Sequence, residues 1–167
     1  MNILFWILGI IVMLFGWVVF RGAPYVPTHR KQVEQALDML DVPEGSTLVD
    51  LGSGDGAFLK AAAARGYHVV GYELNPLLCL VSYLRCWEYR DRVRIRVRDF
   101  WLTPLPTETR AVFVFLAGPY LRRLDQKLQH EVGEHGLTVV SYGFEIPGKK
   151  DRTQTANALH LYHYKKR

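Results

Sequence analysis

Carboxylates and glycines are concentrated between residues 50 and 56, where the chain reads DLGSGDG. An apolar run precedes this stretch and an alanine-rich run follows it, which is typical of a strand, a tight turn and a helix. A formal match to G-x-G-x-x-G/A, at Gly52, Gly54 and Ala57, also occurs in nicotinamide- and flavin-dependent enzymes. Asp50 and Asp55, however, place negative charge where a pyrophosphate needs amide donors. The loop therefore favours a ligand that carries positive charge.

Two further acidic residues lie at the ends of predicted strands. Glu73 ends the second strand, in GYELNP, and Asp99 ends the third, directly before Phe100 and Trp101. A carboxylate at Glu73 can accept hydrogen bonds from both hydroxyls of a ribose, and Asp99 with its aromatic neighbours can flank an adenine. S-adenosylmethionine has a ribose, an adenine, an ammonium and a sulfonium, and no phosphate. We therefore predict S-adenosylmethionine as the cofactor.

The elements that must position these residues alternate along the chain. The predicted helices are 28–41, 56–65, 76–89 and 120–132. The predicted strands are 47–53, 68–74, 93–100, 111–117 and 137–144, with a closing antiparallel strand in ANALHLYHYKK. This order predicts an α/β fold with a doubly wound, mostly parallel sheet. Ligands of such sheets bind at the carboxyl ends of the strands, where the glycine loop is expected.

The first twenty residues contain no charged side chain. They are nearly long enough to cross a bilayer, and they lack the positive start and small-residue cleavage site of a secretory signal. Arg21, Arg30 and Lys31 follow them, so the positive-inside tendency predicts a single-pass membrane protein with its globular part in the cytoplasm or an equivalent compartment. We predict a transmembrane anchor over 1–21, a linker and entry helix over 22–46, and an S-adenosylmethionine-binding domain over 47–167.

A formal net charge of +5 is densest in RDRVRIRVRD, residues 90–99. Arginines alternate there with aliphatic residues, so a strand would present them on one face. An edge strand protected by charge is the favoured interpretation, and a site for anionic lipid head groups is the alternative. Nucleic acid is not predicted as a partner, because the chain has no nucleic-acid-binding module.

The chain has two cysteines, Cys79 and Cys86. Their spacing of seven residues is two helical turns, which is too far for a comfortable disulfide. We expect both to be ordinary core residues, and no zinc-binding pattern is present.

The segments LVDLGSGDG, GYELNP and RDFW resemble, in that order, the cofactor motifs of class I, seven-strand methyltransferases. With PYVPTHRKQVEQALDML upstream, the chain is similar to membrane-anchored protein-lysine N-methyltransferases, whose mitochondrial members modify the adenine nucleotide translocase and the c-subunit of ATP synthase. Soluble archaeal lysine methyltransferases share the YVPT-type entry. The resemblance implies a membrane bilayer and a lysine-bearing, membrane-associated protein as partners.

The resemblance also implies roles for individual residues. The cofactor loop would consist of Asp50, Gly52, Ser53, Gly54, Asp55 and Gly56. Glu73 would hold the ribose, Asp99 and Phe100 would flank the adenine, and Tyr25 and Thr28 would cover the methionine end.

Tyr25 and Tyr120 are the candidate catalytic residues, as an aromatic mouth for the acceptor amine. Many amino-methylating relatives carry an Asn/Asp-Pro-Pro-Tyr/Phe motif, where this chain reads FLAGPYL. The missing amide or carboxylate argues against glutamine or adenine as the acceptor.

Three functions are compatible with these features. Methylation of a lysine in a membrane-associated protein is favoured. Methylation of an amine-bearing lipid or small molecule is the first alternative. A non-catalytic, membrane-held partner with the methyltransferase fold is the second, and the intact acids and glycines count against it.

Overall fold

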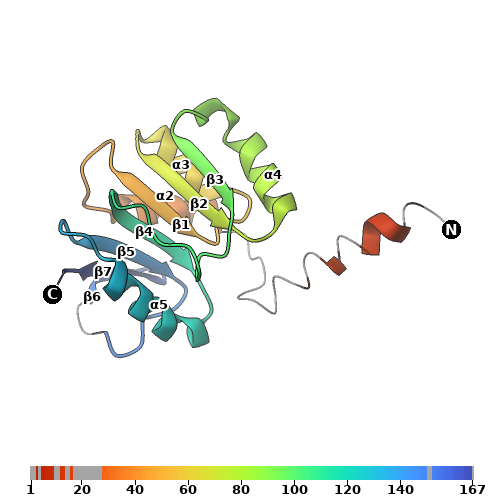
Figure 1. Ribbon diagram of the computed structural model, residues 1–167. Coiled ribbons are helices and arrows are strands. Elements are labelled where there is room, and N and C mark those ends of the chain that lie inside the picture. The colour runs from red at the N-terminus through yellow and green to blue at the C-terminus, as the bar shows by residue number, and fades with distance from the viewer. Residues whose placement is uncertain are drawn as a thin grey trace.

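The computed structural model describes residues 28–149 and 152–166, together with residues 3, 5–9, 12, 13 and 16 (Figure 1). The helices are α2 (Arg30–Asp38), α3 (Ala57–Ala64), α4 (Pro76–Arg85), the short 3-10 helix η1 (Trp87–Tyr89) and α5 (Gly118–Glu131). The strands are β1 (Thr47–Leu51), β2 (His68–Glu73), β3 (Val93–Val97), β4 (Thr109–Phe115), β5 (Leu137–Tyr142), β6 (Arg152–Ala156) and β7 (Leu159–Tyr164).

The strands form one sheet in the order β3-β2-β1-β4-β5-β7-β6. The first five strands are parallel to one another, and β7 is antiparallel to both β5 and β6. The predicted α/β sheet, mostly parallel with an antiparallel end, is confirmed. The prediction missed β6, because its sequence RTQTA lacks the apolar alternation that marks a half-buried strand.

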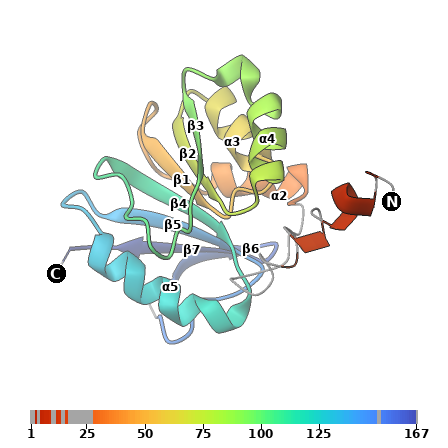
Figure 2. The ribbon, with the colours of Figure 1, turned by 45° about the vertical axis from the view of Figure 1, so that its right-hand side comes forward.

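Helices cover both faces of the sheet. Figure 2 shows α2, α3 and α4 on one face and α5 on the other. The alternation of side chains along β1 explains this arrangement: Leu48 packs with Val33 of α2 and Phe58 of α3, whereas Val49 packs in the opposite cluster with Leu121 of α5. Phe58 also stacks on Phe113 of β4, with ring centroids 4.4 Å apart. The four inner parallel strands, β2, β1, β4 and β5, are thus buried on both faces, as their continuous apolar runs require.

The arginine-rich strand β3 lies at one edge of the sheet. Val93 is buried and Ile95 packs against the α2 and α3 side of the core, while Arg94 and Arg96 are exposed. The interpretation as a charged edge strand fits this position, since charge on an edge discourages pairing with another chain.

Cys79 and Cys86 are free and buried, as predicted. Burial raises the pKa of each thiol to about 11, so both are protonated at neutral pH. Neither cysteine is therefore a reactive nucleophile.

The prediction of a single-pass membrane protein is wrong. Among the residues that the structure describes, no helix is long and apolar enough to cross a membrane. This finding contradicts the predicted localisation and does not support the transmembrane anchor expected over 1–21. Tyr25 lies outside the described residues.

Candidate functional site

The glycine loop joins β1 to α3 at the carboxyl edge of the sheet. Gly52, Gly54 and Gly56 all have positive φ, at 88°, 52° and 80°. Gly56 is the N-cap of α3, and a Cβ there would lie 3.0 Å from Cβ and 3.1 Å from Cα of Ser82 on α4. The loop therefore needs glycine at this position both for its backbone conformation and for its close contact with α4.

Glu73 fastens this loop to the end of β2. One carboxylate oxygen accepts a hydrogen bond from the Gly54 N–H at 2.9 Å, and the other accepts one from the Asn75 N–H at 2.8 Å. Asn75 in turn caps α4, since its Oδ1 accepts from the Leu77 N–H at 2.9 Å. Each Glu73 oxygen retains a lone pair, so the carboxylate can still accept from two ligand hydroxyls. We call the Gly54, Glu73 and Asn75 contacts the carboxylate clasp.

Asp50 lies beside the clasp and is almost fully buried. Desolvation raises its pKa well above the usual range, and the negative charges of Glu73 and Asp55 raise it further. Asp50 is therefore within electrostatic reach of Glu73 at the end of β2 and of Asp55 in the glycine loop. In the described part of the chain, no group of three or more His, Cys, Asp or Glu side chains is placed to hold a metal ion.

Asp55 differs from the expectation in one respect. Its carboxylate pairs with Arg85 of α4 at 2.8 Å, and it also accepts from the Ala57 N–H at 3.3 Å. The arginine partly neutralises the charge that was expected to repel a pyrophosphate. Asp55 therefore contributes less repulsion at the loop than the sequence suggested.

Asp99 begins a loop that runs from the end of β3 to β4. Its Oδ1 accepts from the Trp101 N–H at 2.9 Å, and its carbonyl accepts from Thr103 Oγ1 at 2.8 Å. Phe100 is buried in the core, and its ring lies 4.6 Å from that of Trp101. Phe100 therefore packs mainly against protein, so its role beside an adenine stays a prediction.

The remaining predicted residues lie on other elements. Tyr120 is in the first turn of α5, with its ring centroid 6.4 Å from that of Trp101. Thr28 is half-buried just before α2, and Ser53 is buried in the glycine loop. The structure thus joins the glycine loop, Asp50 and Glu73 in one cluster and places Tyr120 with the aromatic residues that follow β3.

Sequence analysis missed three residues that shape the site. Gly71 lies opposite Asp50 in the β1–β2 register, and a Cβ there would approach Ser53 Oγ to 2.7 Å. Asn75 and Arg85 were also not singled out. An Asn-Pro pair opening a helix signals Asn75 as an N-cap, and a glycine inside a strand signals a close backbone contact at Gly71. The pairing of Arg85 with Asp55, 30 positions away, leaves no local signal.

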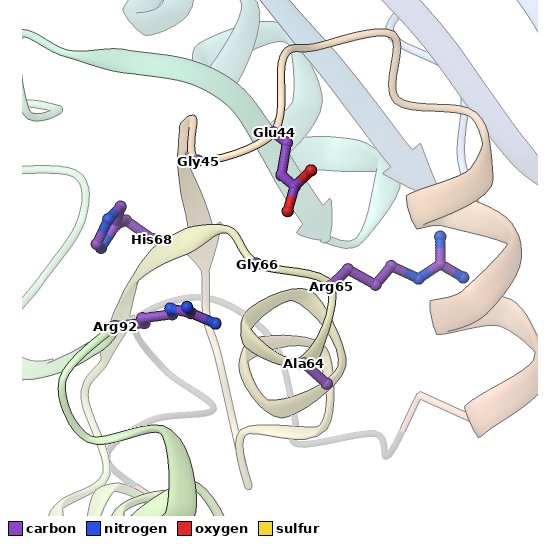
Figure 3. A pocket seen from close by; sticks show the side chains of 7 residues that line it. All are labelled: Glu44, Gly45, Ala64, Arg65, Gly66, His68 and Arg92. Carbon is purple, nitrogen blue, oxygen red and sulfur yellow. The ribbon is translucent and has the colours of Figure 1, made fainter.

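A hollow of about 700 Å³ lies at the opposite end of the strands, and Figure 3 shows the residues that line it. Its arginines and histidine do not converge on one point. Arg65 extends toward α2, where it pairs with Glu34 at 2.6 Å and Asp38 at 2.7 Å, while Arg92 and His68 lie on the other side (Figure 3). None of the predicted site residues borders this hollow, and it lies at the amino ends of the strands.

Comparison with solved structures places this fold among methyltransferases. An RNA methyltransferase from Salinibacter ruber, solved with S-adenosyl-L-homocysteine, is 30% identical, with a TM-score of 0.72 over 83% of this chain and 92% of that protein. Geranyl diphosphate methyltransferase, solved with its diphosphate substrate and sinefungin, is 27% identical, with a TM-score of 0.58 over 66% of this chain and 44% of that protein.

The model of the ANTKMT methyltransferase domain matches residues 50–153, so this chain belongs to that family. The human lysine N-methyltransferase of the ATP synthase c-subunit is 36% identical over 126 residues, which are 74% of this chain and 53% of the human protein. The mouse adenine nucleotide translocase lysine N-methyltransferase is 39% identical over 74% of this chain and 54% of its own length. A protein-lysine N-methyltransferase of Saccharolobus islandicus is 32% identical over 75% of this chain and 79% of its own.

The family resemblance inferred from the motifs is confirmed. The chain spans about half the length of the vertebrate relatives that it matches.

The contact at Gly56 generates a first prediction. Gly56→Ala should lower the free energy of unfolding by about 2 to 5 kcal/mol, because it adds an overlap with Ser82 to the strain of a positive φ. Gly45→Ala is the matched control: its φ is +77°, but nothing lies within 4 Å of a Cβ there, so it should cost only about 1 to 2 kcal/mol. Urea unfolding of both variants measures the difference, and equal losses would contradict the proposed contact.

Asp50 generates a second prediction. Its pKa is raised in the folded state, so the wild-type protein loses stability as pH rises from about 4 through the folded-state pKa. Asparagine does not titrate, so Asp50→Asn lacks this loss. The free energy of unfolding of Asp50→Asn, measured relative to that of wild type at the same pH, should therefore increase as pH rises. Urea unfolding at pH 4.5 and pH 8 measures this gain. A gain that is larger at pH 4.5 than at pH 8 would refute the assignment.

Proposed function

We propose that this protein is an S-adenosylmethionine-dependent methyltransferase that methylates the ε-amino group of a lysine in another protein. The observation that carries the proposal is the carboxylate clasp. Glu73 is held by two backbone amides at the carboxyl edge of β2, directly beside the glycine loop and the buried Asp50. The names of the relatives, all lysine N-methyltransferases, support the choice of acceptor.

The described residues fit this cofactor. Glu73 retains acceptor capacity for two ribose hydroxyls, and its orientation is set before any ligand arrives. The acidic pair Asp50 and Glu73 favours a ligand with an ammonium and a sulfonium over a pyrophosphate, because a bound cation favours the ionised form of Asp50 that burial and the neighbouring carboxylates disfavour. The loop amides near Gly52 are not available as a phosphate cradle, since the N–H groups of Gly52 and Ser53 already donate to the Tyr72 carbonyl at 2.9 and 3.0 Å.

When bound, the cofactor supplies an electrophilic methyl group, which passes from sulfur to the amine nitrogen in one in-line displacement. The protein's part is to align the amine and to keep it neutral. A lysine amine has a pKa of about 10.4 in water, and an apolar, aromatic surrounding disfavours its charged form. Tyr120 and Trp101, with Phe100 packed against Trp101, provide such a surrounding, and the released proton passes to water.

We limit the acceptor to a protein lysine. The expectation of a membrane-associated acceptor depended mainly on the anchor predicted for residues 1–21, and the structure does not support that anchor. Counterparts of the ATP synthase c-subunit and of the adenine nucleotide translocase are the first acceptors to test, because the relatives are named for them.

Cofactor binding tests the first half of the proposal. Calorimetry should detect S-adenosylmethionine and S-adenosylhomocysteine and no NAD. Glu73→Ala should weaken S-adenosylmethionine binding by about 2 to 3 kcal/mol, the scale of lost charge-assisted hydrogen bonds. It should also lower the stability of the unliganded protein, because the Gly54 and Asn75 amides lose their acceptor. The exposed Glu88→Ala is the control and should change neither quantity.

Normal cofactor affinity in a folded Glu73→Ala protein would make Glu73 purely structural. Tighter binding of NAD than of S-adenosylmethionine would overturn the choice of cofactor.

Methyl transfer tests the second half. Purified full-length protein is incubated with S-adenosylmethionine labelled in its methyl group and a whole-cell lysate, and the label is then followed into protein, lipid and RNA fractions. Label in protein, recovered as methyl-lysine after hydrolysis, is the expected result. Label in lipid or RNA would show that the acceptor is a lipid or an RNA and not a protein lysine. Binding of the cofactor without any transfer would favour the non-catalytic alternative.

A further inference from the structure

Arg123 lies on α5, three residues after Tyr120, and so on the same side of the helix. Its guanidinium covers the Trp101 ring, with Cζ 4.3 Å from the ring centroid. Trp101 is itself fixed by Asp99, which accepts its backbone N–H, and by the neighbouring Phe100 ring. The arginine therefore rests on an ordered aromatic platform next to the candidate acceptor mouth.

The loop that carries Trp101 is tied to α5 as well. Lys127 Nζ donates to the Thr103 carbonyl at 2.8 Å, and Glu131 accepts from the Leu105 N–H at 2.8 Å. The loop that carries Trp101 and the helix α5 that carries Arg123 are thus hydrogen-bonded to each other. A side chain on such a support loses little conformational entropy when it binds a ligand.

Arg123 has no carboxylate partner within the part of the chain that the structure describes, whereas Arg65 has two and Arg85 has one. Stacking uses the flat face of a guanidinium and leaves the N–H groups at its edge available. These N–H groups match a carboxylate in a two-bond geometry. Arg123 is exposed, so a ligand from outside can reach it.

We propose that Arg123 is a specificity-determining residue that binds an acidic side chain close in sequence to the target lysine. The inference rests on the proposed function and refines its substrate class to lysines with an Asp or Glu nearby. The formal net charge of +5 favours the approach of acidic segments to the protein. The methionine carboxylate of the cofactor is the competing ligand for Arg123, and the test separates the two.

The test uses two synthetic eleven-residue peptides with one central lysine. One carries Asp two positions before and two positions after the lysine, and the other carries Asn at both places. With full-length wild-type protein, kcat/KM should be about five- to tenfold higher for the Asp peptide, as expected for one charge-assisted contact at an exposed site. In Arg123→Gln the ratio should fall to near one, and in Arg123→Lys it should be intermediate. The matched control, Arg122→Gln, should keep the wild-type ratio.

Calorimetry with S-adenosylmethionine is run on the same four proteins. Unchanged cofactor affinity in Arg123→Gln is expected, and a loss of affinity in step with activity would assign Arg123 to the cofactor and overturn the proposal. Equal rates for both peptides with wild type, or an unchanged ratio in Arg123→Gln, would also overturn it and leave the proposed function intact. If neither peptide nor any lysate protein is methylated by wild type, the proposed function itself fails.

Discussion

One carboxylate organises the carboxyl edge of this sheet. Glu73 ends β2, yet its two oxygens bind the backbone of the glycine loop on one side and the start of α4 on the other. The first two β-to-α turns of the fold are thereby fixed to each other through a single buried side chain. A buried carboxylate is stable only when it is hydrogen-bonded, and the two amides supply those bonds. The position of the loop, the orientation of Asn75 and the burial of Asp50 all depend on this clasp.

The edge is divided into two halves of different chemistry. Asp50 and Glu73 make the half at β1 and β2 acidic, whereas the loop after β3 and the start of α5 bring together Trp101, Tyr120 and Arg123. This second half forms because a loop, and not a helix, connects β3 to β4, and because this loop is hydrogen-bonded to α5. A cationic cofactor suits the first half. The second half instead combines aromatic rings with a positive charge, and a nearby positive charge favours the neutral form of an amine.

Much of this arrangement could be predicted from local patterns. Apolar runs identify β1, β2, β4 and β5, and the alternation of arginines with aliphatic residues identifies β3. Parallel strands necessarily bring Asp50 and Glu73 to one edge. Features that depend on contacts distant in sequence could not be predicted, such as the pairing of Arg85 with Asp55 or the stacking of Arg123 on Trp101. β6 was missed because pairing with β7 stabilises a polar sequence as a strand. For residues 1–20, hydropathy alone predicted a membrane span that the described residues do not support.

The acidic half also links ligand binding to folding. Burial of Asp50, and after it the negative charges of Glu73 and Asp55, disfavour its ionised form and raise its pKa, which lowers the stability of the unliganded protein as pH rises above about 4. A bound cation removes part of that repulsion, so the free energy lost in folding is partly recovered in binding. The partner of Asp55, Arg85, limits the cost without neutralising Asp50 itself. Selectivity for a cationic ligand and marginal stability of the empty site therefore have the same origin, and neither can be changed at Asp50 without changing the other.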